Sequence, residues 1–199
     1  MTTDTKSQIL QTALKMFLRS SYKEVSLRDI VNEVDLTKGA FYHYYTSKEQ
    51  VFEEAVKYFY NHVMIADYKG FPRTSLKDFY TAYIKKMQNP PSNMDDMDIE
   101  GTNFFIFMSE AANRISDFLD IHSGQRKKER WAWSEIIGIA KQNKEIKSIL
   151  PDVDIAMLFL NLSDGIMYNS AISKKNVIET LQELKRDWDN LYRLLANKK

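Results

Sequence analysis

Apolar residues recur along most of the chain at intervals of three and four, the spacing that gathers them on one face of an α-helix. In residues 5–20 this stripe consists of Ile9, Ala13, Leu14, Phe17 and Leu18. Comparable stripes predict helices over residues 27–34, 37–44, 47–66, 75–87, 151–172 and 175–197, and around 104–111 and 131–140. Only four prolines and six glycines interrupt 199 residues. The pattern therefore predicts an all-α protein of about nine helices.

Two segments break the helical pattern. Gly70-Phe71-Pro72 separates two predicted helices, and residues 88–100 (QNPPSNMDDMDIE) form a clear loop. The loop gathers four carboxylates without the spacing of a calcium-binding loop, namely Asp95, Asp96, Asp98 and Glu100. We expect a solvated acidic loop and no metal site, because the chain also lacks cysteine and its histidines are isolated. The charged run 126–130 (RKKER) likewise predicts a solvated helix face.

Residues 26–49, SLRDIVNEVDLTKGAFYHYYTSKE, are the most informative stretch for function. Their first helix carries apolar residues at helical spacing, namely Leu27, Ile30, Val31 and Val34. Asp35 suits the turn that follows because Asp tolerates positive φ, and Thr37 is a favourable N-cap for the next helix. That second helix is short, polar and contains Gly39, which suits insertion into the DNA major groove. The alternative is a corner between helices that has no contact with DNA.

Residues 6–52 resemble the N-terminal DNA-binding domain of the TetR (tetracycline-repressor) family. The resemblance rests on Ile9-Leu10, Ala13-Leu14, Phe17, Tyr22, the run SLRDI at 26–30, TKGAFYHYY at 37–45, and SKE at 47–49. The chain departs from the family's usual residues at Ser21, Val31, Asp35 and Val51. The resemblance implies a three-helix helix-turn-helix domain over residues 1–48 and a helical ligand-binding and dimerisation domain over 49–199.

The resemblance also implies which residues contact double-stranded operator DNA. Ser26 and Arg28 would contact phosphate, and Thr37, Lys38 and Gly39 would face base edges. Further phosphate contacts would come from Tyr42, His43 and Lys48, the last at a helix N-terminus that attracts anions. Phe41 and Tyr45 would instead hold the small core.

The last two predicted helices carry a coiled-coil-like seam. Val177, Leu181, Leu184, Trp188, Leu191 and Leu195 alternate steps of four and three, and the helix before offers Ile155, Leu158, Phe159, Leu162 and Ile166. Two such helices from each of two chains would make a four-helix bundle. The resemblance favours this homodimer, with an interface of Ile155, Phe159, Leu162, Ile166, Leu181, Leu184, Trp188 and Leu191. The alternative is that both helices pack only within their own subunit.

Residues 104–167 are rich in aromatic residues and methionine. Six of them, Phe104, Phe107, Met108, Trp131, Met157 and Met167, could line an apolar cavity together with Ile137, with Glu110 or Asn113 as a polar contact. The alternative for each is an ordinary core position. The resemblance implies a pocket for a small-molecule inducer. It also implies that the protein is a repressor, which inducer binding releases from a palindromic operator.

Charge and composition set limits on these interpretations. The net charge is only +1, so a basic DNA-binding face would require Lys6, Arg28, Lys38 and Lys48 to gather locally. The sequence shows no signal peptide and no membrane span, which predicts a cytoplasmic protein. No nucleophile elbow, phosphate loop or dinucleotide motif occurs, so we expect neither an enzyme nor a cofactor. A helical carrier or sensor that has lost operator binding is the alternative function.

Overall fold

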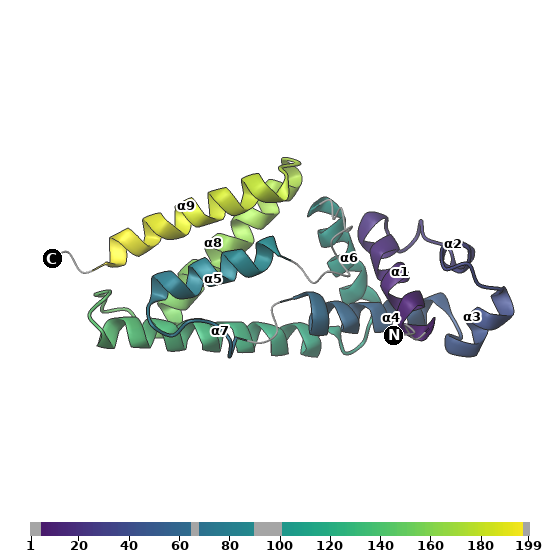
Figure 1. Cartoon of the computed structure of the whole chain (residues 1–199), viewed down its shortest axis with the longest axis horizontal. Helices are drawn as coiled ribbons and strands as arrows, with labels where there is room; N and C mark the ends of the chain where they lie inside the picture. The colour runs from purple at the N-terminus through teal and green to yellow at the C-terminus, as the bar shows by residue number, and fades with distance from the viewer. Residues whose placement is uncertain (1–4, 65–67, 90–100, 197–199) are drawn as a thin grey trace. The chain divides into compact units, whose positions relative to one another are not determined.

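The computed structural model describes residues 5–64, 68–89 and 101–196, in which every regular element is helical (Figure 1). The elements are α1 (Thr5–Arg19), α2 (Leu27–Glu33), α3 (Lys38–Tyr44), α4 (Lys48–Tyr58), the π-helical turn η1 (Phe59–Val63), α5 (Leu76–Gln88), α6 (Gly101–Arg114), α7 (Phe118–Gln142), α8 (Asp152–Ile172) and α9 (Val177–Leu195). The predicted all-α fold of about nine helices is confirmed. The acidic residues of the predicted loop lie outside the described residues.

Side-chain caps fix where α2, α3 and α4 begin. Ser26 accepts a hydrogen bond from the Asp29 N–H at 3.2 Å, and the Asp29 carboxylate accepts one from the Ser26 N–H at 2.8 Å. This capping box starts α2, while Thr37 and Ser47 cap α3 and α4 in the same way with their hydroxyls. Asp35 has a φ of 53°, so the turn predicted between α2 and α3 is confirmed.

The fourth helix differs from the prediction in its second half. We expected one helix from Ser47 to about residue 66, but α4 ends at Tyr58 and a π-helical turn follows. There the Met64 N–H bonds the Phe59 carbonyl at 3.1 Å, five residues back instead of four. Periodicity alone does not reveal this, because the apolar residues of the segment also suit a continuous α-helix.

The chain folds into two compact units, which we call the N-terminal and C-terminal units. The described part of the N-terminal unit covers residues 5–64 and 101–122, and that of the C-terminal unit covers 68–89 and 123–196. The helices α4 and α6 therefore belong to the same compact unit as α1, α2 and α3. The boundary between the two compact units does not fall at residue 48, where we predicted the boundary between the two domains. The division by function into residues 1–48 and 49–199 stays a prediction.

In the N-terminal unit an aromatic core holds α1, α4 and α6 together. The Phe52 ring lies 5.0 Å from Phe17 and 5.5 Å from Phe107, measured between centroids. The Asn103 side chain of α6 also donates to the Arg19 carbonyl at 2.6 Å, at the last residue of α1. Since α1 supports α2, α6 is fastened to the scaffold of the helix-turn-helix.

In the C-terminal unit two tryptophans occupy the centre of the core. Trp133 of α7 and Trp188 of α9 lie 4.9 Å apart between ring centroids, and Trp133 stacks on Phe159 of α8 at 5.2 Å. The Trp188 indole N–H donates to the Phe159 carbonyl at 3.0 Å. Tyr80 of α5 completes the cluster, with its ring 6.0 Å from that of Trp188 between centroids.

Among the described residues, no helix is both long and apolar enough to cross a membrane.

Candidate nucleic-acid interface

The helix α3 is held by its buried side and presents a polar side to solvent. Phe41 and Tyr45 are completely buried, which confirms them as core residues. On the other side Lys38, Gly39 and His43 are exposed, and the large Tyr42 ring is 45% exposed. These four residues leave this side of α3 accessible to a partner.

Gly39 sits where a close approach is possible from outside. A Cβ added at this position would meet no atom within 4 Å, and the backbone does not have a positive φ. Neither strain nor internal packing therefore requires glycine here. An external surface that comes close to the α3 backbone would require it.

The predicted phosphate contacts on α2 lie on the same exposed part of the N-terminal unit. Ser26 and Arg28 are exposed at the first turn of α2, and Thr37 is exposed at the start of α3. The oxygens of Ser26 and Thr37 accept capping bonds, so their hydroxyl hydrogens are the groups left to donate to a phosphate. Seven of the eight predicted DNA contacts are thus exposed around α2 and α3.

Lys48, the eighth, is turned into the chain. Its ammonium donates to the Tyr22 carbonyl at 2.9 Å and the Val25 carbonyl at 3.0 Å, and lies 4.0 Å from the Tyr22 ring centroid. Burial lowers the pKa of this amine. Two of its three N–H bonds are used internally, so the structure gives Lys48 a role in holding the α1–α2 loop. Sequence reasoning missed this role, because a helix N-terminus does not reveal which carbonyls lie beside it.

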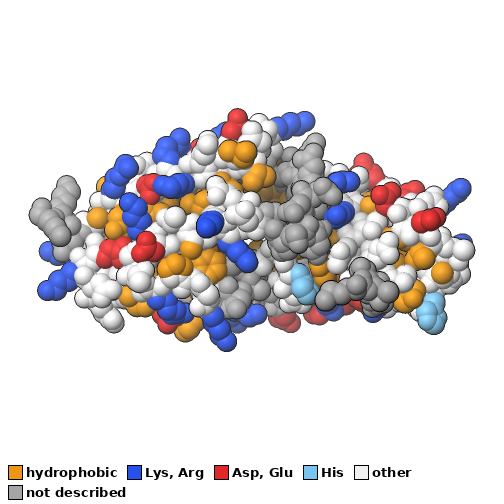
Figure 2. Space-filling view, viewed as in Figure 1, with side chains coloured by type: hydrophobic (Ala, Val, Ile, Leu, Met, Phe, Trp, Pro, Cys, Tyr) orange, Lys and Arg blue, Asp and Glu red, His pale blue; other side chains and the backbone are white. Residues whose placement is uncertain are grey.

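The group of exposed cations expected on the DNA-binding side, namely Lys6, Arg28, Lys38 and Lys48, is smaller than predicted. Lys6 pairs with Glu54 at 3.2 Å and Lys48 is engaged internally, which leaves Arg28 and Lys38 exposed from the four expected cations. On the face drawn in Figure 2, Lys and Arg side chains are interspersed with Asp and Glu and form no single patch. Lys38 itself lies 5.8 Å from the Tyr42 ring centroid.

The predicted dimer seam is used inside the subunit instead. Five of its eight residues are at most 2% exposed, namely Ile155, Phe159, Leu181, Leu184 and Trp188. Ile166 is also buried, and Leu162 and Leu191 are half-buried against the same core. The six buried side chains are covered by α5, α7 and each other within one chain, which contradicts a partner contact for them, whereas the half-buried Leu162 and Leu191 stay predicted interface residues.

The predicted ligand-pocket residues do not come together around one cavity in the described structure. Phe104, Phe107 and Met108 belong to the core of the N-terminal unit, and Glu110 pairs with Arg114 at 2.6 Å. In the C-terminal unit Ile137 is fully buried and Met157 and Met167 border the core. Trp131 is 64% exposed, since its neighbour Trp133 takes the inner face of α7.

A buried carboxylate is the polar feature that the sequence prediction missed. Glu129 was expected on a solvated face, but it is only 6% exposed and accepts hydrogen bonds from Tyr83 at 2.8 Å and Arg126 at 2.7 Å. Arg126 also pairs with Asp164 at 2.7 Å. Burial raises the pKa of the Glu129 carboxyl. The available signal was the helical spacing of Glu129 from Trp133 and Ile136, four and seven positions later, which are both buried.

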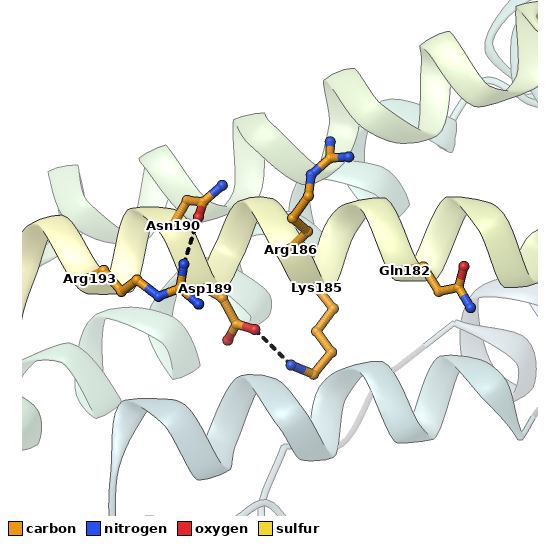
Figure 3. Close-up of a pocket in the computed structure, with 6 residues that line it drawn as sticks. All are labelled: Gln182, Lys185, Arg186, Asp189, Asn190 and Arg193. Carbon is orange, nitrogen blue, oxygen red and sulfur yellow. Dashed lines mark hydrogen bonds and ion pairs between the residues drawn. The ribbon is translucent and has the colours of Figure 1, made fainter.

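A shallow hollow lies along the outer face of α9 (Figure 3). It is lined by Gln182, Lys185, Arg186, Asp189, Asn190 and Arg193. Lys185 pairs with Asp189 at 2.7 Å and Arg193 donates to Asn190 at 3.2 Å. None of the predicted ligand residues lines it.

Comparisons with known proteins match the segment that contains α1, α2 and α3. Residues 9–55 match the family model described as bacterial regulatory proteins, tetR family. The HTH-type transcriptional repressor KstR2 of Mycolicibacterium smegmatis is 25% identical over 168 residues, covering 80% of this chain and 74% of that protein. The uncharacterized HTH-type regulator YuxN of Bacillus subtilis is 40% identical over 53 residues, covering 27% of this chain and 18% of YuxN.

Solved structures share the fold over almost the whole chain. A TetR-family regulator from Cytophaga hutchinsonii superposes with a TM-score of 0.73 at 20% identity, covering 98% of this chain and 96% of that one. The reduced form of NemR from Escherichia coli gives 0.68 at 18% identity, covering 98% and 100%. At these identities the similarity establishes the fold of both units.

Proposed function

The chain belongs to the tetR family of bacterial regulatory proteins, and we propose that it is a cytoplasmic repressor that binds a palindromic operator as a homodimer until a small-molecule inducer releases it. One observation supports operator binding above the others. The exposed side of α3 combines a cation, an exposed aromatic ring and a glycine with open space around it. Each chain of the dimer would place one α3 in a major groove.

The contacts divide into two kinds by their chemistry. Lys38, with its long charged side chain, is suited to base edges or to phosphate, while Ser26, Arg28, Tyr42 and His43 offer donors for phosphate oxygens. Phosphate contacts orient the protein without reading sequence. Thr37, Lys38 and Gly39 would therefore carry the sequence preference.

The test is binding of the full chain to the DNA upstream of its own gene, measured by fluorescence anisotropy. We expect Lys38→Ala to weaken specific binding by about 1–3 kcal/mol, roughly fivefold to 150-fold. Lys127→Ala, which removes the same charge from an exposed position of α7, serves as the matched control and should bind like the wild type. Binding of K38A equal to that of K127A would remove α3 from the interface.

A different stripe on α8 is suited to the dimer contact. Leu158, Tyr168 and Ile172 are 45%, 53% and 60% exposed, and with Asn161 and Gly165 they step by three and four residues. That is the heptad spacing of a helix–helix seam. The open space at Gly165 allows a partner helix to approach closely. We place the dimer seam on this stripe, in place of the buried faces.

The inducer part of the proposal rests on the family alone, since the predicted pocket residues lie in two separate cores. An inducer would act by binding better to a conformation in which the two α3 helices no longer fit successive grooves. A thermal-shift screen of small molecules, followed by operator binding in the presence of each hit, tests this part. Hits that stabilise the protein without weakening operator binding would favour the carrier or sensor function.

A further inference from the structure

Tyr22 lies in the loop between α1 and α2 and is almost completely buried. Its ring is 4.9 Å from Phe52 of α4 and 5.8 Å from Phe17 of α1, measured between centroids. Its hydroxyl donates to the Glu49 carboxylate at 2.6 Å, at the start of α4. The side chain therefore ties the loop before α2 to both helices that support it.

Two cations from different helices lie against this ring. The Lys48 ammonium, at the first residue of α4, and the Arg114 guanidinium, at the last residue of α6, are each 4.0 Å from the ring centroid. Each cation is attracted to the ring face, while the two repel each other. The Glu110 carboxylate, 2.6 Å from Arg114, and the loop carbonyls bonded to Lys48 offset that repulsion. Tyr22 thus links α6 to α4.

The same contacts reach the start of the helix-turn-helix. Lys48 donates to the Val25 carbonyl at 3.0 Å, and Val25 immediately precedes Ser26, the N-cap of α2. The short helix α2 leads through the turn at Asp35 directly into α3. A displacement of Tyr22 would therefore shift the first turn of α2 and change the direction in which α3 points.

We infer that Arg114 is a positioning residue for operator binding, which acts through Tyr22 and Lys48 on the orientation of α2 and α3. This inference rests on the proposed function, in which α3 contacts DNA. Arg114 lies on a helix outside the helix-turn-helix, and its side chain is 34% exposed. It touches neither α2 nor α3 in the contacts described, and the Tyr22 ring is the contact that connects it toward them.

The experiment compares full-length wild type, Arg114→Met and Arg114→Lys on one duplex, selected from random-sequence DNA with the wild type. The matched control is Arg130→Met, the same substitution at an exposed position of α7. We expect R114M to raise the operator Kd about fivefold to tenfold, R114K to recover part of the loss, and R130M to match the wild type. The slope of log Kd against log salt should not change, because no phosphate contact is removed.

A double-mutant cycle identifies the path through the ring. In a Tyr22→Leu background R114M should have no further effect on Kd, whereas in a Tyr22→Phe background, which keeps the ring, it should retain its full effect. Circular dichroism at the titration temperature gives the folded fraction to which each Kd is referred. If Y22L is unfolded, the contrast of R114K with R114M in the Y22F background replaces it.

Each outcome separates the inference from the proposed function. Equal Kd values for R114M and R130M overturn the positioning role. A salt slope lowered by about one unit for R114M would make Arg114 a direct phosphate contact and also overturn it. If the wild type selects no DNA sequence at all, operator binding itself fails, which is a different result from an R114M variant that binds normally.

Discussion

Placing the same aspartate at two positions distinguishes the buried core seam from the exposed stripe on α8. Leu184 of α9 is completely buried, whereas Ile172 of α8 is 60% exposed. At Leu184 the substitution removes the whole burial of a leucine, about 1.5–3 kcal/mol, and places a carboxylate without a partner in an apolar core, which costs several kcal/mol more. Against a typical total stability of about 5–15 kcal/mol, we expect L184D to be largely unfolded.

At Ile172 the cost to the isolated subunit is small. Only about two fifths of this side chain is removed from water within one chain, which corresponds to roughly 1 kcal/mol. If a partner covers the stripe, the new carboxylate would be desolvated in the interface, and a loss of about 2 kcal/mol would raise the dimer Kd about thirtyfold. We therefore expect I172D to be folded and shifted toward monomer.

Sedimentation velocity over a range of concentrations, with circular dichroism on the same samples, measures both effects. Ile149→Asp, at a fully exposed position before α8, is the matched control and should behave as the wild type. A folded, dimeric I172D would refute the α8 stripe as the interface. A folded, monomeric L184D beside a dimeric I172D would restore the seam first predicted from the sequence.

Two further predictions concern pH and ligand. Burial raises the folded-state pKa of Glu129 above its unfolded value, so the folded protein binds this proton more tightly than the unfolded protein does. As pH falls through that raised pKa, the free energy of unfolding of the wild type should rise relative to that of Glu129→Gln, by at most about 1.4 kcal/mol per pH unit. Urea unfolding of both proteins at several pH values measures this difference. A constant difference between the two proteins across pH would contradict the buried, ionisable carboxylate. An inducer at about 100 times its Kd should add roughly 2.7 kcal/mol of stability, and should lower operator affinity by the same factor by which operator lowers inducer affinity. An operator affinity that stays unchanged when the inducer is bound, measured by calorimetry, would mean that the two ligands are not coupled.

The local features of the chain were predictable because they depend on neighbours in sequence. Helical periodicity predicted the all-α fold, and the cap at Thr37 was readable from its residue type. The positive φ of Asp35 followed from the tolerance of Asp for that conformation. Burial of Phe41 and exposure of Tyr42 followed from their positions about 100° apart around one short helix. These features depend on interactions within a few residues, which the sequence contains.

What depended on packing between distant helices was not predictable in the same way. The apolar stripe of α9 predicted a buried face, but periodicity does not say whether that face is covered by another chain or by the chain's own α5 and α8. The sequence by itself determined the helices, their caps and the family's DNA-binding pattern. Only the tertiary structure placed Glu129 inside, turned Lys48 toward the loop carbonyls and brought Arg114 onto Tyr22, 92 positions earlier in the chain. Such contacts depend on how whole helices pack against one another. No local pattern in the sequence indicates which distant residues will be in contact.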